Sequence, residues 1–194
     1  MSKLYFKYGT MGSSKTALAL MCKYNYEQKG FNVWLIKPEV DIRYDVKGEN
    51  PIVKSRIGLK SECETFNKTD SLISMFNQRK NKNYGVIIVD ECQFLTEHQV
   101  DELKELTKFV PVLCYGLKTN YLTKLFEGSK RLLELAESIT EIKTVCKCGN
   151  KSTLNARLNN GKLVTDGEEL FIGGDESYEG VCYCCYKKLK EQIK

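Results

Sequence analysis

Hydrophobic and polar positions along the chain form short blocks that predict strands alternating with helices. Apolar residues cluster at 4–8, 33–36, 84–89 and 111–115, which we interpret as strands, and a further strand is expected near 139–145. Residues 84–89 show no polar alternation, which is typical of a strand buried on both faces. Between the strands, we expect helices at 17–29, 69–82, 96–108 and 129–137. This order predicts an α/β fold built on a doubly wound, mostly parallel sheet.

Some of these helices carry more detailed signals. In the first helix, the residues expected on the apolar side are Ala17, Leu18, Leu20 and Met21. The second helix is expected to begin at a Thr69-Asp70 cap. Thr96 and Gln99 match a capping box at the start of the third helix.

The composition is that of an ordinary globular protein. The 194 residues allow one domain, or one domain with a small appendage, and 42% of them are hydrophobic. No apolar run approaches the about twenty residues of a membrane span, and residues 1–8 lack a secretory signal. We therefore expect a cytoplasmic protein without a membrane partner. The net charge of +5 contains no block of like charge, so nothing requires a nucleic-acid partner.

A glycine-rich segment lies between the first strand and the first helix, where a phosphate-binding loop is found. Its members are Gly9, Thr10, Met11, Gly12, Ser13, Ser14, Lys15 and Thr16. Backbone N–H groups of such a loop cradle a polyphosphate, Lys15 would reach the β- and γ-phosphates, and Thr16 would coordinate Mg²⁺. Ser14 stands where the usual pattern has glycine, and its Cβ would cost about 1 kcal/mol in a glycine conformation. The alternative is a chance turn before a helix, with an exposed lysine.

An acidic pair follows the most hydrophobic strand of the chain. Asp90 ends this strand, the position from which an acidic residue holds Mg²⁺ in phosphate-loop enzymes. Glu91 points the other way if the strand geometry persists, so it could serve as a general base. The alternative is a solvated acidic turn.

Cysteine usage changes toward the end of the chain. Without a secretory signal, the nine cysteines are poorly explained by disulfides. Two groups, Cys146-Lys-Cys148 and Cys182-Tyr-Cys184-Cys185, are separated by 33 residues. We expect a structural Zn²⁺ site from Cys146, Cys148, Cys182 and Cys185, in which Cys184 could replace Cys185. Redox cysteines or chance packing are the alternatives.

The cysteine pattern also suggests how the chain is divided. We expect a nucleotide-binding α/β domain at 1–144 and a small zinc-binding domain at 145–194. Between the two cysteine groups, Asn159-Asn160-Gly161 predicts a hairpin turn.

Taken together, these motifs resemble the zinc-containing, cytosolic type (type II) of thymidine kinase. The resemblance covers residues 3–186 and rests on the segments 9–16, 41–44, 90–94, 116–121 and 172–174, followed by Tyr178. It implies a P-loop NTPase-like sheet and a C-terminal domain that carries a lasso-like, substrate-binding loop. It also implies transfer of the γ-phosphoryl group of ATP to the 5′-hydroxyl of thymidine, with Mg²⁺, giving dTMP.

The resemblance implies roles for individual residues. Glu91 would be the base that accepts the proton of the 5′-hydroxyl. Asp41, Arg43, Asp90 and Gln93 would join the phosphate loop in binding ATP. The residues that would bind thymidine are Met11, Tyr121, Glu169, Leu170, Phe171, Ile172, Gly173 and Tyr178. Family members form dimers and tetramers, so we expect a homo-oligomer, with dTTP as feedback inhibitor.

Two other functions remain to be weighed. The pattern Asp-Glu-x-Gln also occurs in helicases, which favours a nucleic-acid-dependent ATPase, but such enzymes resemble two stacked nucleotide-binding domains and this chain has room for one. A non-catalytic, zinc-dependent scaffold that decayed at Ser14 is the other alternative. The retained Lys15, Thr16 and the acidic pair Asp90-Glu91 argue against decay.

Overall fold

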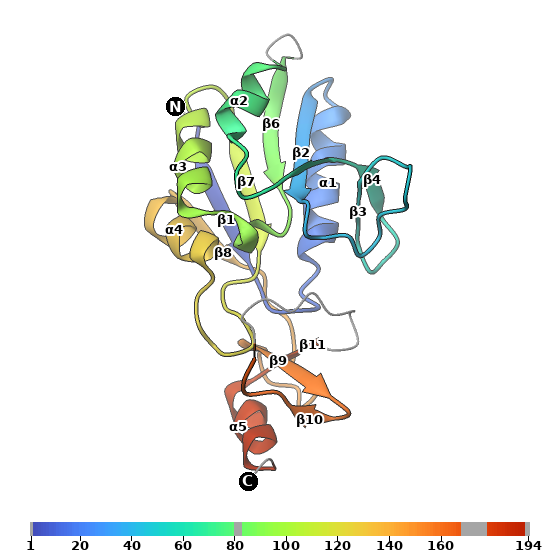
Figure 1. Cartoon of the computed structure of the whole chain (residues 1–194), viewed down its shortest axis with the longest axis vertical. Helices are drawn as coiled ribbons and strands as arrows, with labels where there is room; N and C mark the ends of the chain where they lie inside the picture. Colours follow the sequence, from blue (N-terminus) through green and yellow to red (C-terminus); the bar gives the residue numbers. More distant parts are fainter. Residues whose placement is uncertain (1, 80–82, 168–177, 193–194) are drawn as a thin grey trace.

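The computed structural model describes residues 2–79, 83–167 and 178–192, which form two lobes of unequal size (Figure 1). The larger lobe contains a six-stranded sheet with helices on both faces, and the smaller lobe contains three short strands and the C-terminal helix.

The sheet of the larger lobe is parallel. Its strands are β1 (Leu4–Tyr8), β2 (Asn32–Pro38), β5 (Glu64–Phe66), β6 (Tyr84–Val89), β7 (Val112–Gly116) and β8 (Ser138–Glu141). They lie in the order β5-β2-β6-β7-β1-β8, and each neighbouring pair is parallel. This arrangement confirms the predicted α/β fold, because crossovers through helices are what parallel neighbours require.

The helices cover both faces of this sheet. They are α1 (Lys15–Glu27), α2 (Leu72–Asn77), α3 (Glu97–Leu106) and α4 (Glu127–Leu135). A short 3-10 turn, η2 (Cys92–Phe94), follows β6, and a hairpin of β3 (Ile52–Lys54) and β4 (Lys60–Glu62) projects beside α1 (Figure 1). This hairpin was not predicted from the sequence, because its two strands have only three residues each.

Strand β6 is buried on both faces, as predicted. Ile87 and Val89 pack in a core with α2, α3 and α4, whereas Val86 and Ile88 pack in a second core with α1. Successive side chains of a strand point to opposite faces, so a strand between two helical layers has no polar position.

The predicted start of α2 is wrong. The helix begins after Ser71, whose hydroxyl accepts a hydrogen bond from the N–H of Ser74. Thr69 and Asp70 instead form a turn with Asn67, in which Asp70 accepts from the backbone N–H of Asn67. Asp and Thr side chains stabilise turns as readily as helix caps, so the residue types did not distinguish the two.

The predicted apolar side of α1 is right for Ala17 and Leu20 and wrong for Leu18 and Met21. Leu18 and Met21 are 38% and 52% exposed, while Ala17, Ala19 and Leu20 are buried. Residues 17–22 are all apolar, so the pattern contains no polar face that could orient the helix. By contrast, the capping box between Thr96 and Gln99 is present at the start of α3.

The smaller lobe has its own sheet and core. Its strands β9 (Leu154–Asn159), β10 (Lys162–Leu163) and β11 (Tyr178–Val181) are antiparallel, and helix α5 (Tyr183–Glu191) packs beside them. Asn160 and Gly161 have φ angles of 48° and 77°, as the two-residue turn of a tight hairpin requires. The hairpin predicted at Asn159-Asn160-Gly161 is therefore confirmed.

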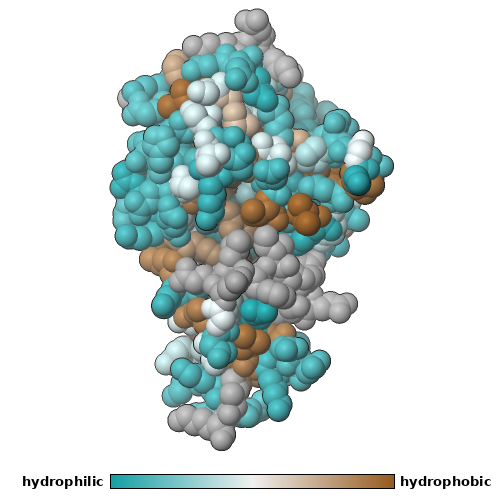
Figure 2. Space-filling model, viewed as in Figure 1, coloured by the Kyte–Doolittle hydropathy of each residue, from teal (hydrophilic) through white to brown (hydrophobic). Residues whose placement is uncertain are grey.

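The surface is mixed in polarity. Figure 2 shows one face that is mostly hydrophilic on the larger lobe, with hydrophobic residues gathering toward the level where the smaller lobe begins. Among the described residues, no helix combines the length and apolarity that crossing a membrane would require.

Candidate active site

The glycine-rich loop joins β1 to α1 at the carboxyl end of the sheet. The backbone N–H of Gly9 donates to the carbonyl of Gly116, at the end of the neighbouring strand β7. A Cβ at Gly9 would lie 2.3 Å from Oγ of Ser13 and 2.5 Å from the carbonyl oxygen of Ile142. A side chain is therefore excluded at this position, and the loop can pack tightly against the sheet.

Ser14 adopts the conformation that the usual glycine takes. Its φ and ψ angles are 62° and 24°, in the left-handed region, and its side chain makes no capping hydrogen bond to α1, which lies wholly within the described chain. For a residue with a Cβ, this conformation costs about 1–2 kcal/mol. The loop therefore keeps its shape with serine, at an energetic cost.

Lys15 is buried within the loop. Its Nζ atom donates to the carbonyl of Thr10 at 2.9 Å and contacts Oγ of Ser13 at 3.4 Å. Burial lowers the pKa of Lys15, while the nearby carboxylates of Glu91 and Asp90 act to raise it. The ammonium group is thus held over the loop, where the backbone N–H groups of a phosphate-binding loop converge.

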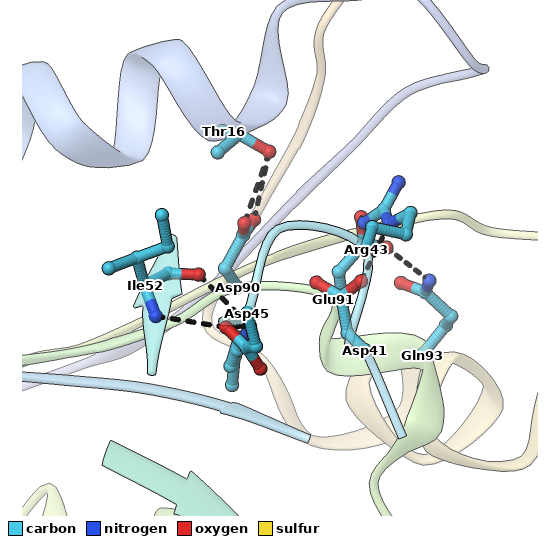
Figure 3. Close-up of polar contacts among 9 residues, drawn as sticks. Thr16, Asp41, Arg43, Asp45, Ile52, Asp90, Glu91 and Gln93 are labelled. Carbon is cyan, nitrogen blue, oxygen red and sulfur yellow. Dashed lines mark hydrogen bonds and ion pairs between the residues drawn. The ribbon is translucent and has the colours of Figure 1, made fainter. Parts of the chain in front are cut away.

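Asp90 and Thr16 meet below the loop. The hydroxyl of Thr16 donates to Oδ2 of Asp90 at 3.1 Å (Figure 3). Burial, followed by the charge of Glu91, raises the pKa of Asp90 to about 7, and the Thr16 hydrogen bond opposes the shift. A hydroxyl and a carboxylate are oxygen ligands of the kind that Mg²⁺ prefers, so the pair fits that ion.

Glu91 points away from Asp90, but strand geometry is not the reason. Strand β6 ends at Val89, and Glu91 has φ 50° and ψ 39°, again in the left-handed region. This turn directs its carboxylate toward Arg43 and Gln93 while Asp90 faces Thr16 (Figure 3). The two neighbouring carboxylates therefore contact different groups.

A polar network holds the carboxylate of Glu91. Nη2 of Arg43 lies 2.5 Å from Oε1 of Glu91, and Nε of Arg43 lies 2.6 Å from Oδ1 of Asp41. Gln93 donates to the other oxygen of Glu91 at 2.5 Å and accepts from the backbone N–H of Leu117. Burial acts to raise the pKa of Glu91, but Arg43 and then Lys15 outweigh it, so the pKa is lowered. Glu91, whose side chain is 12% exposed, is therefore a partly buried, charged acceptor.

A buried lysine anchors the segment that carries Asp41 and Arg43. Nζ of Lys37, which is 1% exposed, donates to Oδ1 of Asp45 at 2.7 Å and to the carbonyl of Ile52 at 2.9 Å. Asp45 also accepts from the backbone N–H of Ile52, so the segment and the hairpin share one anchor (Figure 3). This pair was not predicted from the sequence, where its one local signal is a lysine inside a buried strand.

Some of these groups line a cavity of about 260 Å³. Its lining includes residues 11–17 of the loop and α1, together with Arg43 and Glu91. The tip of the β3–β4 hairpin forms another wall. The hairpin residues in the lining are Lys54, Ser55, Arg56 and Ile57, to which the sequence analysis assigned no role.

The residues expected at thymidine lie near the junction with the smaller lobe. The ring of Tyr121, which is 1% exposed, packs edge-to-face against Tyr178 at 6.3 Å and lies 5.4 Å from the guanidinium of Arg157. The backbone N–H of Met11 donates to Oδ1 of Asn155 at 2.8 Å. The other expected residues lie outside the described part of the chain: Glu169, Leu170, Phe171, Ile172 and Gly173.

Four cysteines converge in the smaller lobe. The Sγ atoms of Cys146, Cys148, Cys182 and Cys185 all lie within 4.8 Å of one another. Tetrahedral Zn²⁺ with Zn–S bonds of about 2.3 Å requires sulfur atoms about 3.8 Å apart, so these thiols fit the ion. Cys184 is exposed and lies outside this cluster.

Comparison with known proteins gives consistent matches. The family model described as thymidine kinase matches residues 2–186. A thymidine kinase of Rhodopirellula baltica is 41% identical over 192 residues, which cover 97% of this chain and 89% of the relative. A thymidine kinase of Yersinia pestis is also 41% identical over 192 residues, covering 97% and 96%. A solved Pif1 helicase from Candida albicans has a TM-score of 0.40 at 13% identity, covering 73% of this chain and 36% of the helicase, and this weak likeness carries no argument.

Proposed function

The chain belongs to the thymidine kinase family and is an enzyme that phosphorylates thymidine, and we propose how its residues divide that work. In this proposal, the γ-phosphoryl group of ATP is transferred to the 5′-hydroxyl of thymidine, giving dTMP and ADP. One observation carries the residue assignment: Lys15 of the loop and the charged, partly buried Glu91 line the same cavity.

The loop at residues 9–16 would bind the phosphates of ATP. Its backbone N–H groups and the Lys15 ammonium supply positive charge. Thr16 and Asp90 would hold Mg²⁺, which when bound neutralises phosphate charge. Their hydrogen bond already brings the two ligands together.

Glu91 would act as the general base. Its carboxylate takes the proton of the 5′-hydroxyl as that oxygen bonds to the γ-phosphorus, and the bond from phosphorus to the β–γ bridging oxygen breaks to release ADP. Arg43 and Gln93 orient the carboxylate and keep it charged, with Asp41 holding Arg43. A base in hydrogen-bond reach accelerates such a step by about 10²–10⁴-fold.

Met11, Tyr121 and Tyr178 would contact the thymidine. The packing of Tyr121 against Tyr178 and the position of Met11 at the cavity support this assignment. The segment 169–173 would bind the thymine through backbone groups; this part of the proposal rests on the family resemblance.

Cys146, Cys148, Cys182 and Cys185 would bind a structural Zn²⁺ that ties the two ends of the intervening segment together. We infer from this a two-domain organisation, with a nucleotide-binding domain at 1–144 and a zinc-binding domain at 145–194. The separate core of the smaller lobe supports the division. A homo-oligomer, a cytoplasmic location and inhibition by dTTP are proposed from the family resemblance.

The test is a turnover assay with three acceptors. The purified chain is incubated with ATP and Mg²⁺, and ADP is measured with thymidine, with single-stranded DNA, or with neither. We expect ADP release that depends on thymidine and equals the dTMP formed. ADP release that depends on DNA would support the ATPase alternative, and no release in any arm would support a scaffold.

A further inference from the structure

The tip of the β3–β4 hairpin lies against the phosphate loop and brings an arginine to it. Arg56 lines the same cavity as Lys15 and Glu91. Its Nη1 atom lies 4.0 Å from the position that a Cβ on Gly12 would occupy. Gly12 belongs to the loop proposed to hold the phosphates, so the guanidinium group lies beside the phosphate site.

A tight turn fixes the position of Arg56 in the backbone. The N–H of Gly58 donates to the carbonyl of Ser55 at 3.0 Å, and the N–H of Ser55 donates to the carbonyl of Leu59 at 2.8 Å. Oγ of Ser55, whose residue is 4% exposed, accepts from the N–H of Leu59. Arg56 is the second residue of this turn, so its backbone is held by its neighbours.

The base of the hairpin is held as well. Ile52, the first residue of β3, is bonded through both its N–H and its carbonyl to the Asp45–Lys37 pair. The hairpin is therefore anchored to the same buried lysine as the segment that carries Arg43. This anchoring supports a defined approach of Arg56 to the loop.

The charges around the cavity leave a role for another cation beside the phosphates. Arg43 is paired with Asp41 and Glu91, so these three groups together carry one net negative charge. Lys15 only balances that charge, and Mg²⁺ held by Thr16 and Asp90 would neutralise only part of the several negative charges that the donor brings. Arg43 therefore serves the base more than the phosphates.

Among the described residues that line the cavity, Lys54 and Arg56 are the cations beyond Lys15 and Arg43. Nζ of Lys54 lies 5.2 Å from the centre of the Tyr44 ring, a cation–π contact. Arg56 is the one whose charged group approaches the loop at Gly12.

We propose that Arg56 contacts the γ-phosphoryl group of the bound donor and stabilises the negative charge that it carries during transfer. Arg56 would then act as an arginine finger supplied by the same chain. A guanidinium group suits this role because its planar fork can donate two N–H bonds to phosphate oxygens. The inference rests on the proposed function, since it assigns Arg56 to that same reaction.

The test compares Arg56→Gln and Arg56→Lys with the wild type and with Lys60→Gln. Lys60 is an exposed cation of the same hairpin that does not line the cavity, so its variant controls for loss of hairpin charge. For each protein, kcat, the KM values for ATP and thymidine, and the melting temperature are measured. We expect Arg56→Gln to lower kcat by about 10²–10³-fold, with the KM for thymidine within about twofold and the melting temperature unchanged.

Arg56→Lys separates the effect of the charge from that of the guanidinium geometry. Arg56→Lys keeps the charge but loses the two-donor fork, so we expect its kcat to fall by at least about tenfold. Lys60→Gln should match the wild type. If Arg56→Gln also loses stability, the decision rests on Arg56→Lys at an unchanged melting temperature.

Two results would overturn the inference: a kcat of the deciding variant within about threefold of the wild type, or a change confined to the KM for ATP. The first would mean that Arg56 is not needed for transfer, and the second that it acts only in binding. Absence of thymidine-dependent turnover in the wild type would instead contradict the proposed function itself.

Discussion

Nη2 of Arg43 lies 2.5 Å from Oε1 of Glu91, although the two residues are 48 positions apart in the chain. Gln93 donates to the second oxygen of the same carboxylate. Two donors from different segments thus fix the direction of Glu91, and the ion pair keeps it charged in a partly buried site. An oriented, charged carboxylate is what a general base requires before its substrate arrives.

Glu91→Gln is expected to remove most of the turnover. Glutamine keeps the shape of the side chain but cannot accept the proton, so we expect kcat to fall by about 10²–10⁴-fold while ATP binding is retained. The measurements are steady-state kinetics and calorimetric binding of a non-hydrolysable ATP analogue. Glu62→Gln, an exposed carboxylate on β4, is the matched control; a kcat near that of the wild type in Glu91→Gln would contradict the base assignment.

Arg43→Gln is expected to act through Glu91. Without its cation, Glu91 loses both its orientation and its charge stabilisation, so we expect kcat to fall by about 10–10²-fold. In a chain that already carries Glu91→Gln, we expect Arg43→Gln to lower kcat little further, because the base is no longer present. Kinetics of the single and double variants test this, and effects that simply multiply would show that Arg43 works independently.

Ser14→Gly is expected to stabilise the protein. Glycine relieves the left-handed strain of about 1–2 kcal/mol, against a backbone-entropy cost of about 0.5–1 kcal/mol, so we expect a net gain of about 0.5–1 kcal/mol. Ser14→Ala is the matched control because it keeps the Cβ and therefore the strain. Unfolding in urea measures both variants, and an equal effect of the two would refute strain at this position.

Removal of one predicted zinc ligand should release the metal, whereas removal of its neighbour should not. Cys185 lies in the four-cysteine cluster and Cys184 lies outside it. We expect Cys185→Ser to lose zinc and to melt at a lower temperature, and Cys184→Ser to keep one zinc ion per chain. Elemental analysis and thermal melting test the pair. The ligand set is wrong if Cys184→Ser is the variant that loses zinc.

Lys37→Met is expected to destabilise the fold more than the loss of a surface lysine. It leaves the carboxylate of Asp45, 22% exposed, without its partner, and breaking such a pair costs about 3 kcal/mol. Lys23→Met removes a pair with Glu27 one helical turn away, in which the two side chains are 17% and 44% exposed, and should cost below about 0.5 kcal/mol. Free energies of unfolding for the two variants test the difference. Similar values would mean that Lys37 does not anchor the hairpin.

Some features of the fold can be predicted from the sequence because they depend on residues that are adjacent along the chain. The apolar run of β6 and the hairpin turn at Asn160-Gly161 were predicted, since burial on both faces and positive φ angles select residue types directly. The inner face of α1 was predicted only in part, because Leu18 and Met21, which are exposed, are as apolar as the residues that are buried. Where all the residues of a helix segment are apolar, the sequence does not indicate which side faces the core, and packing decides the orientation of the helix.

The sequence by itself determined the parallel α/β fold, the family, and the residue types of the phosphate loop, the acidic pair and the cysteine groups. These depend on spacing and chemistry that are local to the chain. Tertiary structure alone decided that Glu91 turns toward Arg43, that Lys37 anchors Asp45, and that the hairpin brings Arg56 to the loop. Each of these contacts joins segments that meet only when the sheet and its loops are packed. Their geometry therefore follows from the whole fold, which no local pattern contains.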